Sequence, residues 1–442
     1  MYKATRSMLS KGAARTTMIL VAAALASCGG GGGGSSGDSG SGISPAALAQ
    51  EQDFSGAIGP ISAAAAYDRG YTGDNTIIHM INARVVADDE KTKTNVTRQF
   101  EIDGDALQQV DKEKIYPGNF TSQPISAIHE DTAIAQLIAE PRDGKDGHGI
   151  AYGAKIWAYD QYPLNGNSSS GNTATALIKA AERNDSEVIS LKMNLDLASR
   201  EADIIEAINF AAKNDDLLTI TGRTSLNEEI SSEAIERLGS SIESTLVVGS
   251  IDQDEKIASS PAGAAMDSFL VAPDSYRVAM WKSGSRTEYT DTRCFLIFCE
   301  ELIRVHYPKY WGTYSVTGPQ YAQAVATGAA AVLRSAYPYL SAADIKSLML
   351  TTAKDLGEPG VDDVYGHGLI DLDRATQPVG ELAIAEGQSV DGPSASVSST
   401  NLTFGPAFGD AMTENELLAQ GVAFDDFGRP YTVGLDRRVD HH

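Results

Sequence analysis

The chain has 442 residues, 42% of them hydrophobic, and a formal net charge of −24 at pH 7. The length allows two or three domains, although an α/β fold can run longer as one. The acidic balance argues against nucleic acid or an anionic membrane surface as a partner and favours a well-solvated surface.

The N-terminal stretch, residues 1–27, is predicted to be a targeting signal rather than part of the fold. Its basic residues precede an apolar run, MILVAAALAS, that is too short to span a bilayer as a helix. The run ends at Leu25-Ala26-Ser27-Cys28, which resembles a bacterial lipobox. The resemblance implies a lipid on Cys28, and Gly29 after it suggests sorting to the outer membrane. The alternative is an ordinary signal peptide with an incidental cysteine.

Residues 28–53 are assigned to a flexible tether. The stretch from Gly29 to Gly42 reads GGGGGGSSGDSGSG, a composition that cannot bury a core. Such a polar tether is expected directly after a lipidated cysteine.

From residue 54 to 378, helical and strand patterns alternate with short connections. This alternation predicts an α/β fold built on a doubly wound parallel sheet. The expected elements are a helix ending at Ala63–Tyr67, a strand at Ile77–Ile81, a helix within Ala127–Glu140, a helix at Thr173–Asn184, a strand at Glu187–Met193, a helix from an N-cap at Ser199 to Lys213, a strand at Leu217–Thr221, a helix at Asn227–Leu238 and a strand at Thr245–Ile251.

Residues 283–313 are predicted to be an insertion rich in aromatic and charged residues. It contains Cys294 and Cys299. In an exported chain whose Cys28 carries lipid, these two are the natural disulfide pair, which requires a tight turn between them. No metal site is expected from two thiols alone, since zinc takes four ligands.

A buried helix is predicted from Tyr321 to Leu333, because this run is small or apolar on every side. Ser341 then opens a second helix as its N-cap, with Asp344 at the third helical position. The first residues of the buried helix come to the middle of the fold, where backbone N–H groups and the helix dipole favour negative charge.

Several of these stretches together resemble the subtilases, the subtilisin-like serine proteases. The resemblance covers about residues 58–378 and implies a subtilisin-like fold with a buried central helix. It is carried by YDRGYTGDNTIIHMINAR (67–84), AIHEDTAIAQLIAE (127–140), GPQYAQAVATGAAAVL (318–333) and YGHGLIDLDRA (365–375).

The same resemblance places different residues where the family has its catalytic groups. Asn82 stands for the aspartate, Glu130 for the histidine and Gln320 for the serine nucleophile, while Arg223 stands for the oxyanion-stabilising asparagine. An Asp-to-Asn change alone costs a triad about four orders of magnitude in turnover. The substitutions therefore predict an inactivated site with no cofactor and no metal.

Nearby histidines offer poor replacements. The sedolisins, relatives with the same fold, use a glutamate where Glu130 lies, but they still need the serine. His129 is one residue off, which turns its side chain by about 100° on a helix. His148 is expected in a solvated loop, and His367 is expected to be structural.

Lys192, Met193 and Asn194 replace the family's substrate-lining Ser-Leu-Gly and are the predicted binding residues. Lys192 and Arg223 would make the cleft basic, which favours an acidic partner segment. Residues 379–442 are predicted to be a β-rich extension, similar to the segment that joins subtilase passengers to the barrel of autotransporters.

These observations favour a lipid-anchored subtilisin-fold pseudoprotease of the bacterial envelope that binds an exported protein or an extended peptide as a chaperone, inhibitor or adaptor. Two alternatives stay open. One is a serine-type endopeptidase with residual or unconventional activity through Glu130 or His129. The other is a structural envelope lipoprotein without a ligand groove.

Overall fold

The computed structural model describes residues 44–86, 91–92, 94–103, 106–110, 125–161, 170–183, 188–222, 228–283, 287–295, 298–306, 309–385, 394–398 and 420–434. The chain divides into two compact units. One comprises residues 43–379, and the other comprises residues 1–42 and 380–442. The lipobox and Cys28 lie outside the described residues.

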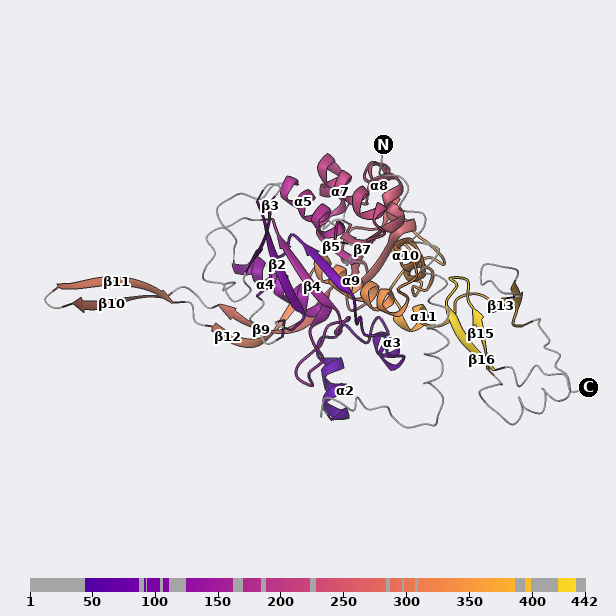
Figure 1. Ribbon diagram of the computed structural model, residues 1–442, viewed down its shortest axis with the longest axis horizontal. Coiled ribbons are helices and arrows are strands. Elements are labelled where there is room, and N and C mark those ends of the chain that lie inside the picture. The colour runs from indigo at the N-terminus through magenta and orange to yellow at the C-terminus, as the bar shows by residue number, and fades with distance from the viewer. Residues whose placement is uncertain are drawn as a thin grey trace, which may run out of the picture. The chain divides into compact units, whose positions relative to one another are not determined.

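An eight-stranded sheet forms the centre of the larger unit, in the order β3-β2-β4-β1-β5-β6-β7-β8 (Figure 1). All neighbouring pairs are parallel except β2 with the edge strand β3. This confirms the predicted α/β fold. The strands are β1 (Ile77–Ile81), β2 (Val96–Asp103), β3 (Ala106–Val110), β4 (Lys155–Asp160), β5 (Val188–Asn194), β6 (Leu217–Thr221), β7 (Thr245–Ile251) and β8 (Phe269–Pro273).

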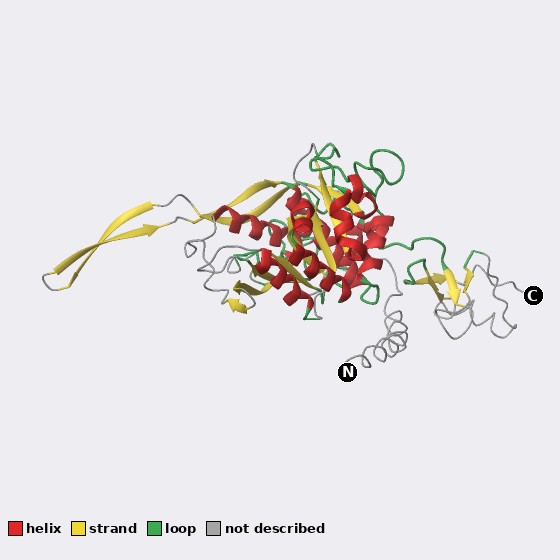
Figure 2. Cartoon of the chain, turned by 90° about the horizontal axis from the view of Figure 1, so that it is seen from above, coloured by secondary structure: helices red, strands yellow, loops and turns green. Residues whose placement is uncertain are grey.

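Helices pack against the strands of the central sheet (Figure 2). The helices of this unit are α2 (Pro45–Phe54), α3 (Ala63–Asp68), α4 (Ile125–Ala139), α5 (Ser170–Ala181), α6 (Leu195–Arg200), α7 (Ala202–Lys213), α8 (Ser232–Leu238), α9 (Pro319–Ala336), α10 (Ala342–Thr351) and α11 (Leu372–Ala375), with 3-10 turns η3 (Gly239–Ser244) and η4 (Gly263–Ser268).

Helix α9 is the predicted buried helix, and every residue from Tyr321 to Arg334 is buried. It contacts β5, β6, β7, β8 and α4. The amide of Gln323 donates to the backbone oxygens of Leu191 (2.9 Å) and Thr219 (2.8 Å), which satisfies polar groups that no water reaches. A Cβ at Gly328 would lie 2.7 Å from Ile150 Cβ, so glycine permits the close approach here.

Of the two residues predicted to cap the start of a helix, Ser341 does so and Ser199 does not. Ser341 caps α10 and exchanges hydrogen bonds with Asp344 as a complete capping box, which confirms that prediction. The prediction for Ser199 is wrong, because the helix is divided into α6, capped by Asn194, and α7, which begins after Glu201. The extended backbone of Glu201 interrupts the helix.

The range assigned to the tether also needs correction, because α2 occupies Pro45–Phe54. Ser44 accepts a hydrogen bond from the backbone N–H of Ala47, and Pro45 stands in the first turn, where its missing N–H costs nothing. The Gly-Ser composition that indicates a tether ends before this helix begins.

The predicted insertion forms antiparallel strands. β9 (Ser275–Ser283) pairs with β12 (Lys309–Thr317), and β10 (Thr287–Phe295) pairs with β11 (Phe298–His306). Cys294 stands directly opposite Cys299 in the register of the second pair. The turn is therefore as tight as the predicted disulfide requires, while the disulfide itself stays a prediction.

The smaller unit contains an antiparallel sheet in the order β14-β13-β15-β16. Its strands are β13 (Ala383–Ala385), β14 (Ser394–Ser396), β15 (Gln420–Phe424) and β16 (Pro430–Gly434). A fully buried ion pair between Arg429 and Asp425 (2.6 Å) lies at the β15–β16 turn.

Candidate functional site

The candidate site lies where β1, β5, α4 and α9 meet. Asn82 directly follows β1, Glu130 lies on α4 and Gln320 in the first turn of α9. The predicted fourth position, Arg223, lies outside the described residues.

Asn82 is buried and has a positive φ of 64°, a conformation that asparagine tolerates better than most residues. The hydroxyl of Thr173 lies 2.9 Å from Asn82 Oδ1 and equally far from Gln161 Oε1, and it donates its single proton to one of them. The described contacts thus direct the Asn82 amide towards α5, as a structural group.

Lys192 at the end of β5 makes two ion pairs with neighbouring residues of α4. Its Nζ lies 3.0 Å from Glu130 Oε1 and 2.5 Å from Asp131 Oδ1. The other oxygen of Asp131 accepts a hydrogen bond from the backbone N–H of Arg84, at 2.9 Å. Three charged side chains are thereby held together where the resemblance expects a catalytic histidine.

Burial and neighbouring charges have opposite effects on the pKa values of Asp131 and Lys192. Burial raises the pKa of Asp131, while Lys192 and the Arg84 N–H oppose the rise. Burial alone would lower the pKa of Lys192, but the two carboxylates outweigh it and hold the pKa well above its usual value. Lys192 is therefore a protonated counter-ion and cannot act as a base. Asp131 was not among the residues predicted for the site, although its place beside Glu130 was a signal.

Gln320, which the resemblance assigns to the nucleophile position, has an amide side chain with no nucleophilic oxygen or sulfur. Its side chain folds back over Gly318, whose positive φ of 140° and missing Cβ leave the room. The phenol of Tyr321 is hydrogen-bonded to the Gln320 side chain, and burial together with the negative charge of Glu130 raises its pKa to about 12. Gln320 and Tyr321 therefore offer neutral hydrogen-bonding groups.

The predicted binding residues have partly structural roles. The Asn194 side chain accepts the N–H of Leu197, at 2.9 Å, as the cap of α6. The carbonyl of Met193 accepts a hydrogen bond from the Thr221 hydroxyl, at 3.2 Å. The expectation that Lys192 makes the cleft basic is wrong, because two carboxylates surround its ammonium group.

His148 is not the solvated loop histidine that the sequence predicts. It is 2% exposed, its Nδ1 lies 2.8 Å from the carbonyl oxygen of Gly149, and its ring meets the rings of Tyr67 and Tyr152 edge-on. Burial lowers its pKa to about 4. The glycines and charged residues around His148 in the sequence suggest an exposed loop and give no sign of its contacts with Tyr67 and Tyr152.

His129 lies half-buried on α4 next to Glu130, and His367 lies between two glycines of the closing motif. Burial lowers the pKa of His367, which makes hydrogen bonds to backbone groups of Leu350 and Asp267. These contacts fit a structural role for His367.

In the described ranges, no three His, Cys, Asp or Glu side chains are grouped so as to hold a metal ion. None of the helices in the same ranges has both the length and the apolar content needed to cross a bilayer.

Several known proteins are similar to parts of this chain. A 127-residue stretch is 34% identical to serotype-specific antigen 1 of Mannheimia haemolytica, covering 28% of this chain and 12% of that protein. A 60-residue stretch is 38% identical to the autotransporter lipoprotein NalP of Neisseria meningitidis, covering 14% and 6% respectively. A 46-residue stretch is 52% identical to an extracellular serine protease of Serratia marcescens, covering 10% and 4%. The matches thus span only a small part of these relatives.

Among solved structures, fervidolysin from Fervidobacterium pennivorans, a keratinolytic enzyme related to subtilisin, has a similar fold. Its TM-score is 0.50 at 17% sequence identity, over 72% of this chain and 45% of that one. The model of the subtilase family matches residues 41–368, which include the whole eight-stranded sheet and α9. The chain belongs to the subtilase family.

Proposed function

We propose that this chain is a pseudoprotease: a subtilisin-fold protein that binds exported proteins or extended peptides and does not hydrolyse them. In this proposal, lipid on Cys28 anchors it to the outer membrane, on the periplasmic side or at the surface. The names of the relatives support an envelope or extracellular location, since they include an autotransporter lipoprotein and an extracellular serine protease.

The paired contact of Lys192 with Glu130 and Asp131 carries this proposal. A triad needs an imidazole that accepts a proton from a nucleophile. Here the carboxylate of Glu130 is 3.0 Å from an ammonium group, and Gln320 supplies no hydroxyl to activate. The site therefore lacks both the acceptor and the nucleophile of subtilase chemistry.

The end of β5 supports the binding role. The pairing of β5 with β1 ends at Leu191, three residues before β5 itself ends at Asn194. A peptide in extended conformation can add to such a strand through backbone hydrogen bonds, which do not require a triad. Because Lys192 is neutralised, we propose recognition by backbone pairing and side-chain shape instead of attraction to an acidic segment.

Hydrolysis is tested with a fluorophosphonate probe, which labels an activated serine covalently. We expect no labelling and no burst of product from acyl substrates, with a serine protease of the same fold as positive control. Labelling of a residue of this chain, lost when that residue is replaced, would overturn the pseudoprotease proposal.

Binding is tested by capture from envelope extract, with the captured proteins identified by mass spectrometry. Met193→Arg puts a bulky charged side chain at the end of β5, and Leu197→Arg on the neighbouring α6, where Leu197 is 52% exposed, is the matched control. We expect Met193→Arg to lose the captured partner and Leu197→Arg to retain it. Equal capture by both variants would show that β5 is not the binding surface.

A second candidate, a serine-type peptidase with unconventional chemistry, is favoured by the printed names of the Serratia marcescens relatives. The fluorophosphonate experiment separates it from the pseudoprotease. The anchor is tested independently with Cys28→Ala, which should move the protein from the membrane to the soluble fraction. Continued fractionation with membranes and unchanged mobility would contradict lipidation.

A further inference from the structure

The hairpin formed by β10 and β11 has an apolar closed end. The two strands form a two-stranded sheet of their own, apart from the central sheet (Figures 1 and 2). Their register places Cys294 opposite Cys299 and, as the last pair, Phe295 opposite Phe298. We call these four residues the apolar end of the hairpin.

The connection between the two strands departs from the usual chemistry of a turn. Two residues, Leu296 and Ile297, separate Phe295 from Phe298 in the sequence, and both lie outside the described residues. Two-residue hairpin connections favour Asn, Asp and Gly, which adopt the required backbone angles at little cost. A departure from local preference is expected where function requires it.

The apolar end is apolar on both faces of the hairpin. Successive residues of a strand alternate between the two faces, so the cysteine pair lies on one face and the phenylalanine pair on the other. The next pair along the strands is charged, with Arg293 opposite Glu300. At about 3.4 Å per residue, the charged pair lies about 7 Å along the strands from the phenylalanine pair.

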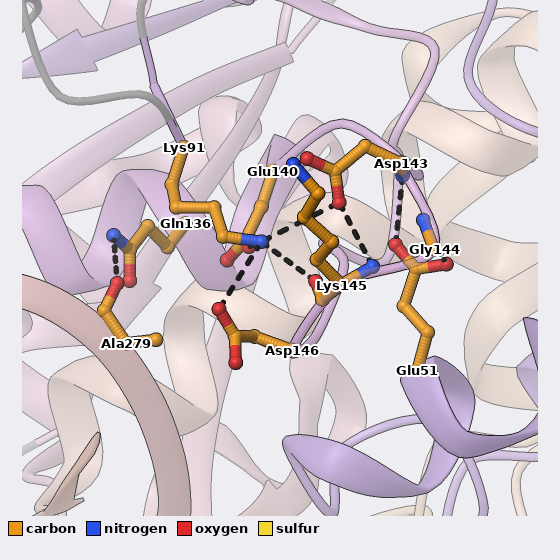
Figure 3. A network of polar contacts seen from close by, with 9 residues as sticks. All are labelled: Glu51, Lys91, Gln136, Glu140, Asp143, Gly144, Lys145, Asp146 and Ala279. Carbon is orange, nitrogen blue, oxygen red and sulfur yellow. Dashed lines mark hydrogen bonds and ion pairs between the residues drawn. The ribbon is translucent and has the colours of Figure 1, made fainter. Parts of the chain in front are cut away.

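The ribbon of β9 and β12, from which the hairpin continues, is fixed at its base. The amide of Gln136 on α4 donates to the carbonyl oxygen of Ala279 in β9, at 2.9 Å (Figure 3). The backbone N–H of Arg277 donates to the carbonyl oxygen of Ser55, at 3.1 Å, and the Arg277 guanidinium group lies 5.3 Å from the ring centroid of Phe54. Helix α4 and the end of α2 therefore both hold β9 near its start.

Helix α2 is itself attached to the loop that follows α4. Glu51 of α2 is 1% exposed, and its two carboxylate oxygens accept the backbone N–H groups of Asp143 (2.8 Å) and Gly144 (3.0 Å). Figure 3 shows this contact together with that of Gln136. The ribbon therefore starts from the packed part of the larger unit.

We propose that the apolar end of the hairpin inserts into the surface of a lipid bilayer. In the described residues β10 and β11 pair with no third strand, and an isolated two-stranded hairpin is only marginally stable in water. A protein surface would cover one face of the hairpin, whereas a bilayer surrounds an inserted end and covers both faces. The distance of about 7 Å to the charged pair falls within the 5–10 Å to which interfacial elements enter the lipid, so Arg293 and Glu300 stay among the headgroups.

The charge of the chain selects the kind of lipid. A formal net charge of −24 opposes binding to an anionic surface, so the partner is a surface of zwitterionic lipid. The contact relies on apolar side chains and depends little on salt. It is independent of the pseudoprotease function and of lipid on Cys28.

The test measures co-sedimentation with phosphatidylcholine vesicles, using the full-length chain with Cys28→Ala so that no attached lipid contributes. This parent is compared with the same chain carrying Phe295→Ser and Phe298→Ser. Val361→Ser in the same parent is the control, because Val361 is apolar and 45% exposed elsewhere in the larger unit. We expect the parent and the control to bind equally. The double variant should bind at least about tenfold more weakly, because two large apolar side chains no longer leave water.

Equal binding by the parent and the double variant would overturn the proposal. Binding that requires phosphatidylglycerol or is lost in high salt would overturn it too, since the contact would then be electrostatic. Light scattering without vesicles tests whether the apolar end meets a second copy of the chain. Self-association that the double variant loses, with vesicle binding unchanged, would likewise contradict insertion.

Hydrogen exchange of the unsubstituted parent gives a second measurement that does not depend on how the variants fold. Amides of β10 and β11 next to Phe295 and Phe298 should exchange at least about tenfold more slowly with phosphatidylcholine vesicles than without them, because insertion removes them from water. Amides of the central sheet should be unaffected. Unchanged exchange at the apolar end would show that it stays in water.

Discussion

Lys192 Nζ lies 2.5 Å from Oδ1 of Asp131, so the end of β5 is joined to α4 beside Glu130, the residue that the resemblance assigns to the position of the catalytic histidine. Asp131 is 1% exposed, whereas Lys192 remains about a quarter exposed at its side chain. Asp131 depends on this ion pair more than Lys192 does, because Asp131 has lost nearly all of its contact with water and Lys192 has not.

Lys192→Met should destabilise the protein by roughly 3 kcal/mol, at the low end of the range for a broken buried pair because the lysine is partly exposed. The physical reason is that Asp131 is left charged and buried without its cation. Urea unfolding measures the change. Lys192→Met combined with Asp131→Leu should cost clearly less, and equal costs for the single and double variants would mean that the pair does not compensate the buried charge.

His148 should make stability depend on pH between about 4 and 6.5. Its pKa is lowered from the usual 6.5 to about 4, so in this window the unfolded chain binds a proton that the folded chain does not. The free energy of unfolding therefore falls as pH falls, by about 1.4 kcal/mol per pH unit for this one group.

His148→Phe keeps a ring against Tyr67 and Tyr152 but cannot titrate. Chemical unfolding across the pH window should show a shallower slope for the variant than for the native chain. His79, whose pKa is lowered to about 3, and the carboxyl groups are present in both proteins. Their contributions to the pH slope therefore cancel when the variant is compared with the native chain. Identical slopes would mean that His148 is protonated in the folded state as readily as in the unfolded chain.

Gln320→Ser should not restore hydrolysis, because the members of a triad act as a unit. The position that the resemblance assigns to the catalytic histidine holds Glu130, whose carboxylate lies 3.0 Å from the ammonium group of Lys192, so no imidazole at that position can remove the proton of the new hydroxyl. Release of a chromogenic peptide product measures the outcome, with the native chain as background. Turnover above that background would show that this site can activate a serine without histidine.

Gly328→Ala should destabilise the protein by about 1–3 kcal/mol, the usual range for overpacking a core. The new Cβ would lie 2.7 Å from Ile150 Cβ, which forces buried groups around α9 apart. An exposed helical glycine would instead gain about 1 kcal/mol from the same change. Urea unfolding shows whether the substitution raises or lowers the free energy of unfolding. An increase would mean that α9 packs more loosely against Ile150 than the structure shows.

Cys294 and Cys299 should show no free thiol in protein isolated under oxidising conditions. Directly opposite residues of an antiparallel pair have Cα atoms about 4.5–5.5 Å apart, which is within the range of a disulfide. Alkylation before and after reduction, followed by peptide mass spectrometry, detects the bridge. Modification of both cysteines without reductant would remove the disulfide.

The sequence was sufficient for the fold where local pattern and burial agree. β1, β6 and β7 have the predicted bounds, because each is a short apolar run that is buried in a parallel sheet. The capping box of Ser341 and Asp344 is similarly local. The break between α6 and α7 was missed, because apolar and polar residues continue through it at helical spacing.

The sequence predicted which residues belong to the candidate site, but it did not predict which side chains contact one another there. Asn82, Glu130 and Gln320 were located by their place in family motifs, but no motif indicates that Lys192 turns towards Asp131. That contact joins residues 61 positions apart and depends on how α4 lies against β5. The burial of His148 depends likewise on Tyr67, which is far away in the sequence.

Helix α2 has a mechanical consequence if the chain is tethered at its N-terminus. Any pull on the tether reaches the folded unit at Ser44, and the two hydrogen bonds of Glu51 to Asp143 and Gly144 then bear part of the load. Ten residues of helix can unravel there before the force reaches the strands of the central sheet. The attachment of α2 would therefore break first under tension. The central sheet and α9 would stay folded.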